Sequence, residues 1–100
     1  MAEQEITNPA ELNAPRDVWV LMQMTGKTTK QRPRAKFNAK SLQAASIAVQ
    51  HEVEARGYLT SECLGAVVFD AAEWTTKVAW IHRNGRVYSE PPTEWKAWLP

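Results

Sequence analysis

A run of apolar residues at helical spacing occupies the middle of the chain, between positions 40 and 57. The apolar stripe of this predicted helix consists of Leu42, Ala45, Val49 and Val53, widened by Ile47, Ala48 and Ala55. Ser41 is suited to cap the first turn, because its hydroxyl can accept a hydrogen bond from an unpaired amide. Gly57 is suited to end the helix, since glycine adopts the left-handed conformation without steric cost. The pattern therefore predicts a helix of about four turns that covers a small sheet.

Alternating apolar and polar positions predict two strands before this helix. Residues 18–24 are apolar on both faces near their start, so we expect this strand to lie centrally in the sheet. Residues 34–39 place Ala35, Phe37 and Ala39 on one face and polar side chains on the other. That alternation is typical of a half-exposed strand. We expect the two strands to pair in antiparallel fashion.

Three more strands are expected after the helix, over residues 64–70, 77–83 and 86–89. Asn84-Gly85 predicts a hairpin with a type I′ turn between the last two strands, because that turn requires positive φ at both central residues. The order ββαβββ predicts an α+β fold, a twisted antiparallel sheet with one helix packed on one face. No second helix is available for the other face, so we expect that face to be partly solvated or bound by a partner.

The two ends of the chain lie outside this pattern. Residues 1–16 are polar and contain two prolines, and we predict that they form a flexible or loosely docked arm before a single domain at 17–100. Residues 8–12 within the arm can form one helical turn with proline at its first position. Residues 93–99 are expected to form a short helical turn whose tryptophans pack back onto the domain.

Composition bounds the class of protein. A chain of 100 residues with 44% apolar residues is expected to form one domain with its own core. The single cysteine, Cys63, excludes an intrachain disulfide and suits a reducing compartment. No run of 18 apolar residues is present, and the first residues lack the core of a signal peptide. We therefore expect a soluble cytoplasmic protein without a membrane partner.

Residues that carry catalytic chemistry are scattered along the chain. Cys63, His51 and His82 lie on different predicted elements without companions at ligand spacing, so we expect no metal site. Cys63 also lacks the basic neighbours that activate a nucleophilic thiol. Asp70 and Glu73 flank the end of a strand, where acids commonly close a turn. No glycine-rich phosphate loop is present. These observations predict a protein that is not an enzyme and that holds no cofactor.

The charge of the chain is unevenly distributed. Its net charge is only +1, yet residues 25–41 carry six bases and no acid, whereas residues 1–17 carry four acids and one base. We call residues 27–40 the basic segment. Its cations are Lys27, Lys30, Arg32, Arg34, Lys36 and Lys40. Arg83 and Arg86 flank the Asn84-Gly85 turn and extend this patch if the two hairpins point the same way.

Like charges held on one hairpin repel each other, and folding alone gives no reason to gather them. One interpretation is that the basic segment contacts phosphates or an acidic protein surface. The other is a solvated loop whose cations aid solubility. No helix-turn-helix, zinc finger or aromatic RNA-binding strand is present. Any direct contact with nucleic acid is therefore expected to be directed at the backbone, sensitive to salt and unspecific. Trp74, Trp80 and Tyr88 are available for base stacking, although core positions explain them as well.

The predicted order of elements resembles that of small bacteriophage proteins. It consists of a strand hairpin, a single helix and a meander that ends in Trp80 and an Asn-Gly turn. The helix is opened by the sequence Phe37-Asn38-Ala39-Lys40-Ser41-Leu42-Gln43-Ala44-Ala45. Nearest in outline are small anti-CRISPR proteins that bind type I surveillance complexes, and small phage inhibitors of host RNA polymerase. The resemblance covers residues 17–90 and is one of pattern. This chain departs from it by a longer acidic arm, a more basic first loop and a tryptophan-rich end.

The resemblance implies a non-catalytic inhibitor that works in the host bacterial cytoplasm. Its partner would be a host complex that processes nucleic acid, and the first candidate is a CRISPR surveillance complex. The inhibitor would block this complex sterically, by occupying a site that nucleic acid otherwise binds. The contacts implied are Lys27, Lys30, Arg32, Arg34 and Lys36, followed by Arg83 and Arg86. Two alternatives stay open, a domain that binds DNA or RNA directly without sequence preference and a structural subunit of a larger particle.

Overall fold

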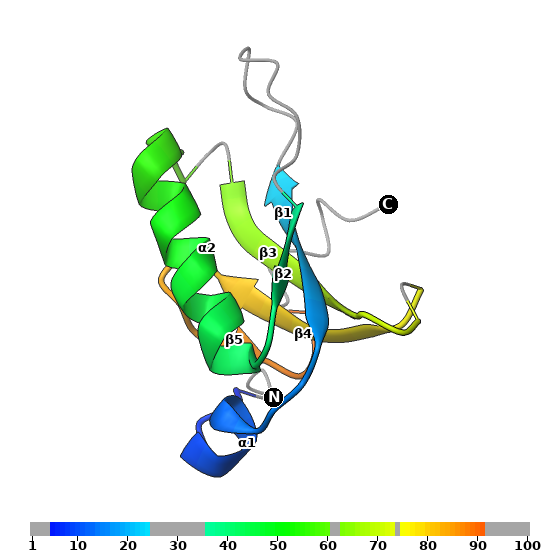
Figure 1. Ribbon diagram of the computed structural model, residues 1–100. Helices are drawn as coiled ribbons and strands as arrows, with labels where there is room; N and C mark the ends of the chain where they lie inside the picture. Colours follow the sequence, from blue (N-terminus) through cyan, green and yellow to red (C-terminus); the bar gives the residue numbers. More distant parts are fainter. Residues whose placement is uncertain (1–4, 25–35, 61–62, 74, 92–100) are drawn as a thin grey trace.

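The computed structural model describes residues 5–24, 36–60, 63–73 and 75–91 (Figure 1). The elements are α1 (Pro9–Asn13), β1 (Val18–Met24), β2 (Lys36–Ala39), α2 (Leu42–Arg56), β3 (Cys63–Asp70), β4 (Lys77–His82) and β5 (Val87–Tyr88). After the short α1 this is the predicted order ββαβββ, and the predicted α+β class is confirmed. Neither described helix is long and apolar enough to cross a membrane.

The five strands form one antiparallel sheet in the order β2-β1-β3-β4-β5. Val20 of β1 lies opposite Phe37 of β2 on one side and opposite Val68 of β3 on the other, and Val68 in turn lies opposite Ala79 of β4. Val20, Val68 and Ala79 are all fully buried. The interior position of β1 and its antiparallel pairing with β2 are therefore as predicted.

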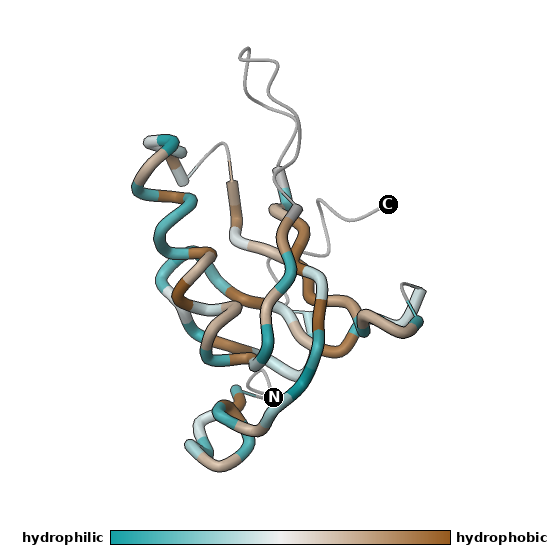
Figure 2. Tube along the Cα trace, in the orientation of Figure 1, coloured by the Kyte–Doolittle hydropathy of each residue, from teal (hydrophilic) through white to brown (hydrophobic). Residues whose placement is uncertain are grey.

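Helix α2 begins and ends where its capping residues predict. The Ser41 hydroxyl accepts a hydrogen bond from the Ala44 amide at 3.0 Å, and Gly57 adopts the left-handed conformation with φ of 65°. Figure 1 shows α2 lying across one face of the sheet, and hydropathy alternates along it (Figure 2), as expected of a helix with one buried face. Leu42, Ala45 and Val49 on that face are buried.

The predicted width of the apolar stripe on α2 is wrong. Ile47 is 49% exposed, and Ala55 is exposed as well. Each residue of an α-helix advances about 100° around the axis, so a residue two positions from a core residue points away from the core. Ile47 lies two residues after Ala45, and Ala55 lies two residues after Val53. The core stripe is therefore narrower than the sequence suggested.

The β4–β5 hairpin is present, but its predicted type I′ turn is wrong. Of the described residues only glycines have positive φ, so Asn84 lacks the conformation that a type I′ turn demands. The Gly85 amide donates to the His82 carbonyl oxygen at 2.8 Å, and the His82 amide donates to the Arg86 carbonyl oxygen at 2.8 Å. This pattern is that of a three-residue loop that ends in a glycine bulge, with Gly85 at φ of 95°.

The described part of the N-terminal arm lies against the domain. Its predicted helical turn is α1, capped by the Asn8 side chain and with proline in its first turn. The Ile6 amide donates to the Val87 carbonyl oxygen at 2.7 Å, which adds Glu5 and Ile6 to the free edge of β5. Ile6 and Leu12 are half-buried against the core. The helical turn expected at 93–99 falls outside the described residues.

The sheet face opposite α2 carries four aromatic side chains. Trp19 pairs with Phe69 across β1 and β3, and Trp80 pairs with Tyr88 across β4 and β5. All four side chains are half-buried. The Trp80 Nε1 atom is shielded from solvent and has no hydrogen-bond partner among the described residues. Trp74, the other aromatic residue considered for stacking, lies outside them.

Candidate functional site

Most of the basic segment lies outside the described residues. Lys27, Lys30, Arg32 and Arg34 fall in that part of the chain. Lys36 opens β2, where its backbone lies opposite Leu21 of β1. These four cations therefore lie in the sequence between the end of β1 at Met24 and the start of β2 at Lys36. That they contact a partner stays a prediction.

Lys40 has an acidic partner in its own chain. Its Nζ atom lies 2.9 Å from Asp17 Oδ1, which also accepts a hydrogen bond from Asn38 Nδ2 at 2.8 Å. The hydrogen bond from Lys40, followed by that from Asn38, holds the pKa of Asp17 below its ordinary value of 3.8. The two charged side chains are 78% and 55% exposed, so this ion pair adds little to stability. Lys40 is therefore tied to the start of β1, although still accessible.

Arg83 binds backbone atoms of its own chain. Its guanidinium donates to the Tyr58 carbonyl oxygen at 2.6 Å and to the Cys63 carbonyl oxygen at 3.2 Å. These contacts join the end of β4 to the connection between α2 and β3. Both hydrogen bonds run from the Arg83 side chain to backbone carbonyl groups, so Arg83 links segments that are 20 or more residues apart in the sequence. The half-buried Arg83 thus has a role in the fold that needs no partner.

Arg86 is exposed just before β5. Gln23 of β1, Gly65 of β3 and His82 of β4 lie opposite one another in the sheet. The chain therefore leaves β1 toward the basic segment, and β4 toward Arg86, at the same end of the sheet. That Arg86 extends the basic patch stays a prediction, because residues 25–35 lie outside the described residues.

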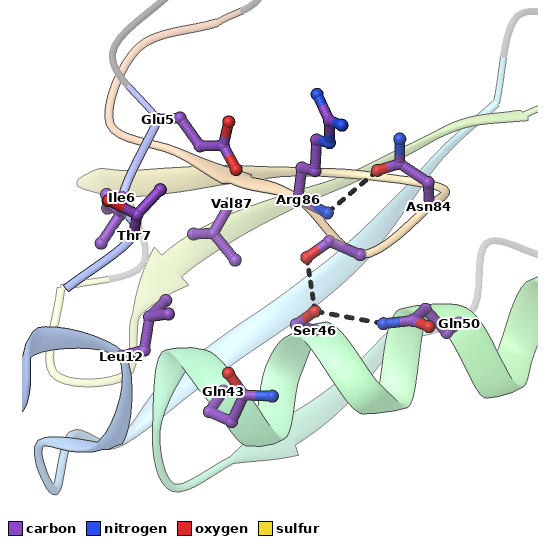
Figure 3. A pocket seen from close by; sticks show the side chains of 11 residues that line it. Glu5, Ile6, Thr7, Leu12, Gln43, Ser46, Gln50, Asn84, Arg86 and Val87 are labelled. Atoms are coloured by element: carbon purple, nitrogen blue, oxygen red, sulfur yellow. Dashed lines mark hydrogen bonds between the residues drawn. The ribbon is translucent and has the colours of Figure 1, made fainter. Parts of the chain in front are cut away.

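A cavity that the sequence did not predict lies beside Arg86 (Figure 3). Its volume is about 360 Å³, and its walls come from three parts of the chain. The arm contributes Glu5, Ile6, Thr7 and Leu12, helix α2 contributes Gln43, Ser46 and Gln50, and the β4–β5 hairpin contributes Asn84, Gly85, Arg86 and Val87. No local pattern announces such a site, because more than 70 residues separate the arm from the hairpin.

One wall of the cavity is fixed by the contact between the hairpin and α2. The buried Ser46 hydroxyl donates to the Gly85 carbonyl oxygen at 2.6 Å and accepts a hydrogen bond from Gln50 Nε2 at 3.4 Å. A β carbon at position 85 would collide with the Gln50 side chain and press on the Ser46 hydroxyl. Because the end of the Gln50 side chain can move aside, the main reason for glycine here is its positive φ.

The cavity offers polar groups that the fold leaves unused. The side chains of Gln43 and Arg86 form no hydrogen bond or ion pair with the described residues. Asn84 uses its Oδ1 atom to accept a hydrogen bond from the Arg86 amide at 3.0 Å, which leaves its Nδ2 donors available. Ile6 is half-buried beside them, whereas Val87 is buried. In Figure 3 the guanidinium of Arg86 points away from α2, the helix that carries Gln43.

The lining of the cavity contains one acid, Glu5, and no histidine or cysteine. In the part of the chain that the structure describes, no three His, Cys, Asp or Glu side chains are grouped to hold a metal ion. Cys63 is buried, and its thiol donates to the Gly65 carbonyl oxygen at 3.4 Å. Comparison of the chain with protein-family models, with curated proteins and with solved structures finds no match.

Proposed function

We propose that this protein is a non-catalytic inhibitor of the phage type, which binds a host complex that processes nucleic acid and blocks it sterically. A CRISPR surveillance complex is the first candidate for that partner. The observation that carries the proposal is the basic segment, with six cations and no acid between β1 and α2. The core is built from apolar side chains, which within the basic segment come from Phe37 and Ala39, so folding does not require the six cations.

The way in which the basic segment is attached supports a binding role. β1 and β2 pair from Val18–Ala39 to Leu21–Lys36, so both ends of the segment are anchored in the sheet. Loops held on a rigid scaffold commonly carry binding residues. Charged contacts of this kind raise association rates and select partners of opposite charge. A small domain that presents one such loop is suited to occupy a site on a larger complex.

The overall charge favours a protein partner over nucleic acid alone. A domain that binds nucleic acid directly usually has an isoelectric point above about 9, whereas that of this chain is about 7.9. Helix α2 carries Glu52 and Glu54, so it is a poor reader of a DNA groove. Direct binding to DNA or RNA is the second candidate, favoured by the six cations of the basic segment and by the exposed Arg86.

The first experiment tests the basic segment by charge reversal. Lys30→Glu with Arg32→Glu should abolish capture of the partner complex from bacterial lysate while leaving the circular dichroism spectrum unchanged. A matched control, Arg16→Glu with Lys77→Glu, makes the same change of net charge at two exposed sites elsewhere. Capture should persist in the control. Equal capture by both variants would exclude the basic segment as the contact.

A second measurement separates the two candidate partners. Direct binding to a labelled DNA duplex should weaken steeply between about 50 and 200 mM salt, because neutralised phosphates release counterions. It should also need no other protein. An inhibitor of a host complex should bind naked DNA weakly and co-purify with defined subunits, identified by mass spectrometry. Tight, salt-sensitive DNA binding without any captured complex would favour the second candidate.

A further inference from the structure

A row of side chains crosses the sheet on the face opposite α2. It runs through directly paired positions of four strands and consists of Leu21 in β1, Val67 in β3, Trp80 in β4 and Tyr88 in β5. We call these four residues the far-face row. The core cluster under α2 takes Val68 from β3 and not Val67, because successive side chains of a strand point to opposite faces. Helix α1 packs against α2, so neither described helix covers the row (Figure 1).

The middle of this face is nevertheless shielded from water. Val67 is only 3% exposed, and Gln23, on the same face of β1, is only 6% exposed. The Trp80 Nε1 atom is also shielded and has no hydrogen-bond partner among the described residues. An antiparallel sheet face with nothing packed on it is commonly solvated, and a buried indole N–H usually finds an acceptor. The burial is therefore that of a packed surface, although neither described helix packs on it.

Residues 92–100 are long enough to cover the far-face row. They follow β5, the strand at the edge of the sheet that carries Tyr88. Neighbouring strands lie about 4.8 Å apart, so Val67 is two strand spacings, about 10 Å, from β5. A segment of this length spans up to about 30 Å when extended and about 14 Å when helical. Residues 92–100 can therefore reach across the row in either conformation.

The composition of residues 92–100 suits an apolar surface. Trp95 and Trp98 are three residues apart, so they share one face of the helical turn predicted for this segment. Glu94 and Lys96 carry opposite charges, so the segment brings no net charge to the sheet. We propose that residues 92–100 pack their tryptophans on the far-face row and close the second face of the sheet.

A face that is occupied by its own chain is not available to a partner. A structural subunit of a larger particle, one alternative left open by the sequence, would therefore lack this face as its contact. The inhibitor function uses the basic segment and is not affected. This inference goes beyond that function and does not depend on it.

Nuclear Overhauser spectroscopy on the full chain tests which residues touch the row. The methyl protons of Val67 should show cross-peaks to the indole protons of Trp95 or Trp98. Cross-peaks to Trp74 or to residues 25–35 instead would overturn the proposal, because another part of the chain would then be the cover. Cross-peaks that arise only between differently labelled copies in a mixed sample would also overturn it, since a second copy would then occupy the face. So would an absence of cross-peaks from Val67 to any residue outside the sheet.

Two double substitutions in the full chain test what the tryptophans contribute. Trp95→Ala with Trp98→Ala should uncover the row, so fluorescence of the dye ANS, which binds exposed apolar surface, should rise. The Trp80 Nε1 proton should then exchange with solvent at least about tenfold faster, because exchange reports local exposure. Glu94→Ala with Lys96→Ala keeps the net charge and both tryptophans, so this matched control should change neither measurement. Equal dye binding and equal exchange in the two variants would overturn the proposal.

Discussion

Asp17 joins three neighbouring parts of the fold through one exposed carboxylate. It precedes β1 and accepts hydrogen bonds from Asn38 in β2 and from Lys40 just before α2. The Arg16 amide donates to the Lys40 carbonyl oxygen at 2.8 Å beside them. Because both side-chain donors favour the ionised form, the pKa of Asp17 is lowered in the folded protein. The stability that this carboxylate contributes must therefore depend on pH.

The coupling between Asp17 and Lys40 should disappear in acid. A carboxyl group whose pKa is lowered by folding stabilises the protein above its unfolded pKa, here about 3.8. That contribution is lost as the pH falls through the lower, folded value. Urea unfolding of Asp17→Asn, Lys40→Gln and the double variant should give a small coupling free energy near pH 7. At a pH below the folded pKa the coupling should vanish; a coupling that persists there would contradict the assigned pair.

Two glycines, Gly65 and Gly85, adopt backbone conformations that the sequence analysis did not predict. Gly65 lies within β3 at φ of 145°, and a β carbon there would fall on the Ile81 carbonyl oxygen of β4. Gly85 was expected in a two-residue turn and instead ends a three-residue loop. The difference arises because Asn84 accepts a local hydrogen bond from Arg86, and because Ser46 of α2 holds the Gly85 carbonyl group. The second contact is tertiary, so the sequence of the turn does not encode it.

At the scale of elements, α2 was the most predictable part of the chain. Ser41 and Gly57 cap it as their chemistry indicates, and both neighbouring strands occupy their expected ranges within two residues. Local signals suffice there, because caps and alternation act between residues close in sequence. The cavity was not predictable in the same way. It depends on how α2, the arm and the hairpin meet, and only packing determines that arrangement.

The orientation of α2 can be tested with two aspartate substitutions on the same helix. Val49 is fully buried, so Val49→Asp places an unpaired charge in the core at a cost of several kcal/mol, against a typical total of about 5–15 kcal/mol. We expect loss of the cooperative unfolding transition in circular dichroism. Ile47→Asp, at a position 49% exposed, should change stability by only about 0.5 kcal/mol. Equal tolerance of both substitutions would mean that α2 faces the sheet differently.

At the scale of the whole molecule, the arm completes both the sheet edge and the cavity. Its Ile6 amide binds the outer edge of β5, and α1 packs beside α2. β5 has only two residues, and the arm bridges its outer edge between Glu5 and Tyr88. An edge covered in this way is protected from pairing with other chains. The arm thus joins the end of the sheet to the start of the helix.

Removal of residues 1–15 should lower stability without unfolding the domain. The loss of the Ile6–Val87 hydrogen bond and of the half-buried Ile6 and Leu12 side chains should outweigh the chain entropy recovered, by about 1–3 kcal/mol. The midpoint of thermal unfolding should then fall by about 4–20 °C, and unfolding should remain a single transition. Ile6→Ala with Leu12→Ala in the full chain should reproduce most of this shift. An unchanged midpoint in the shortened chain would show that the arm does not stabilise the domain.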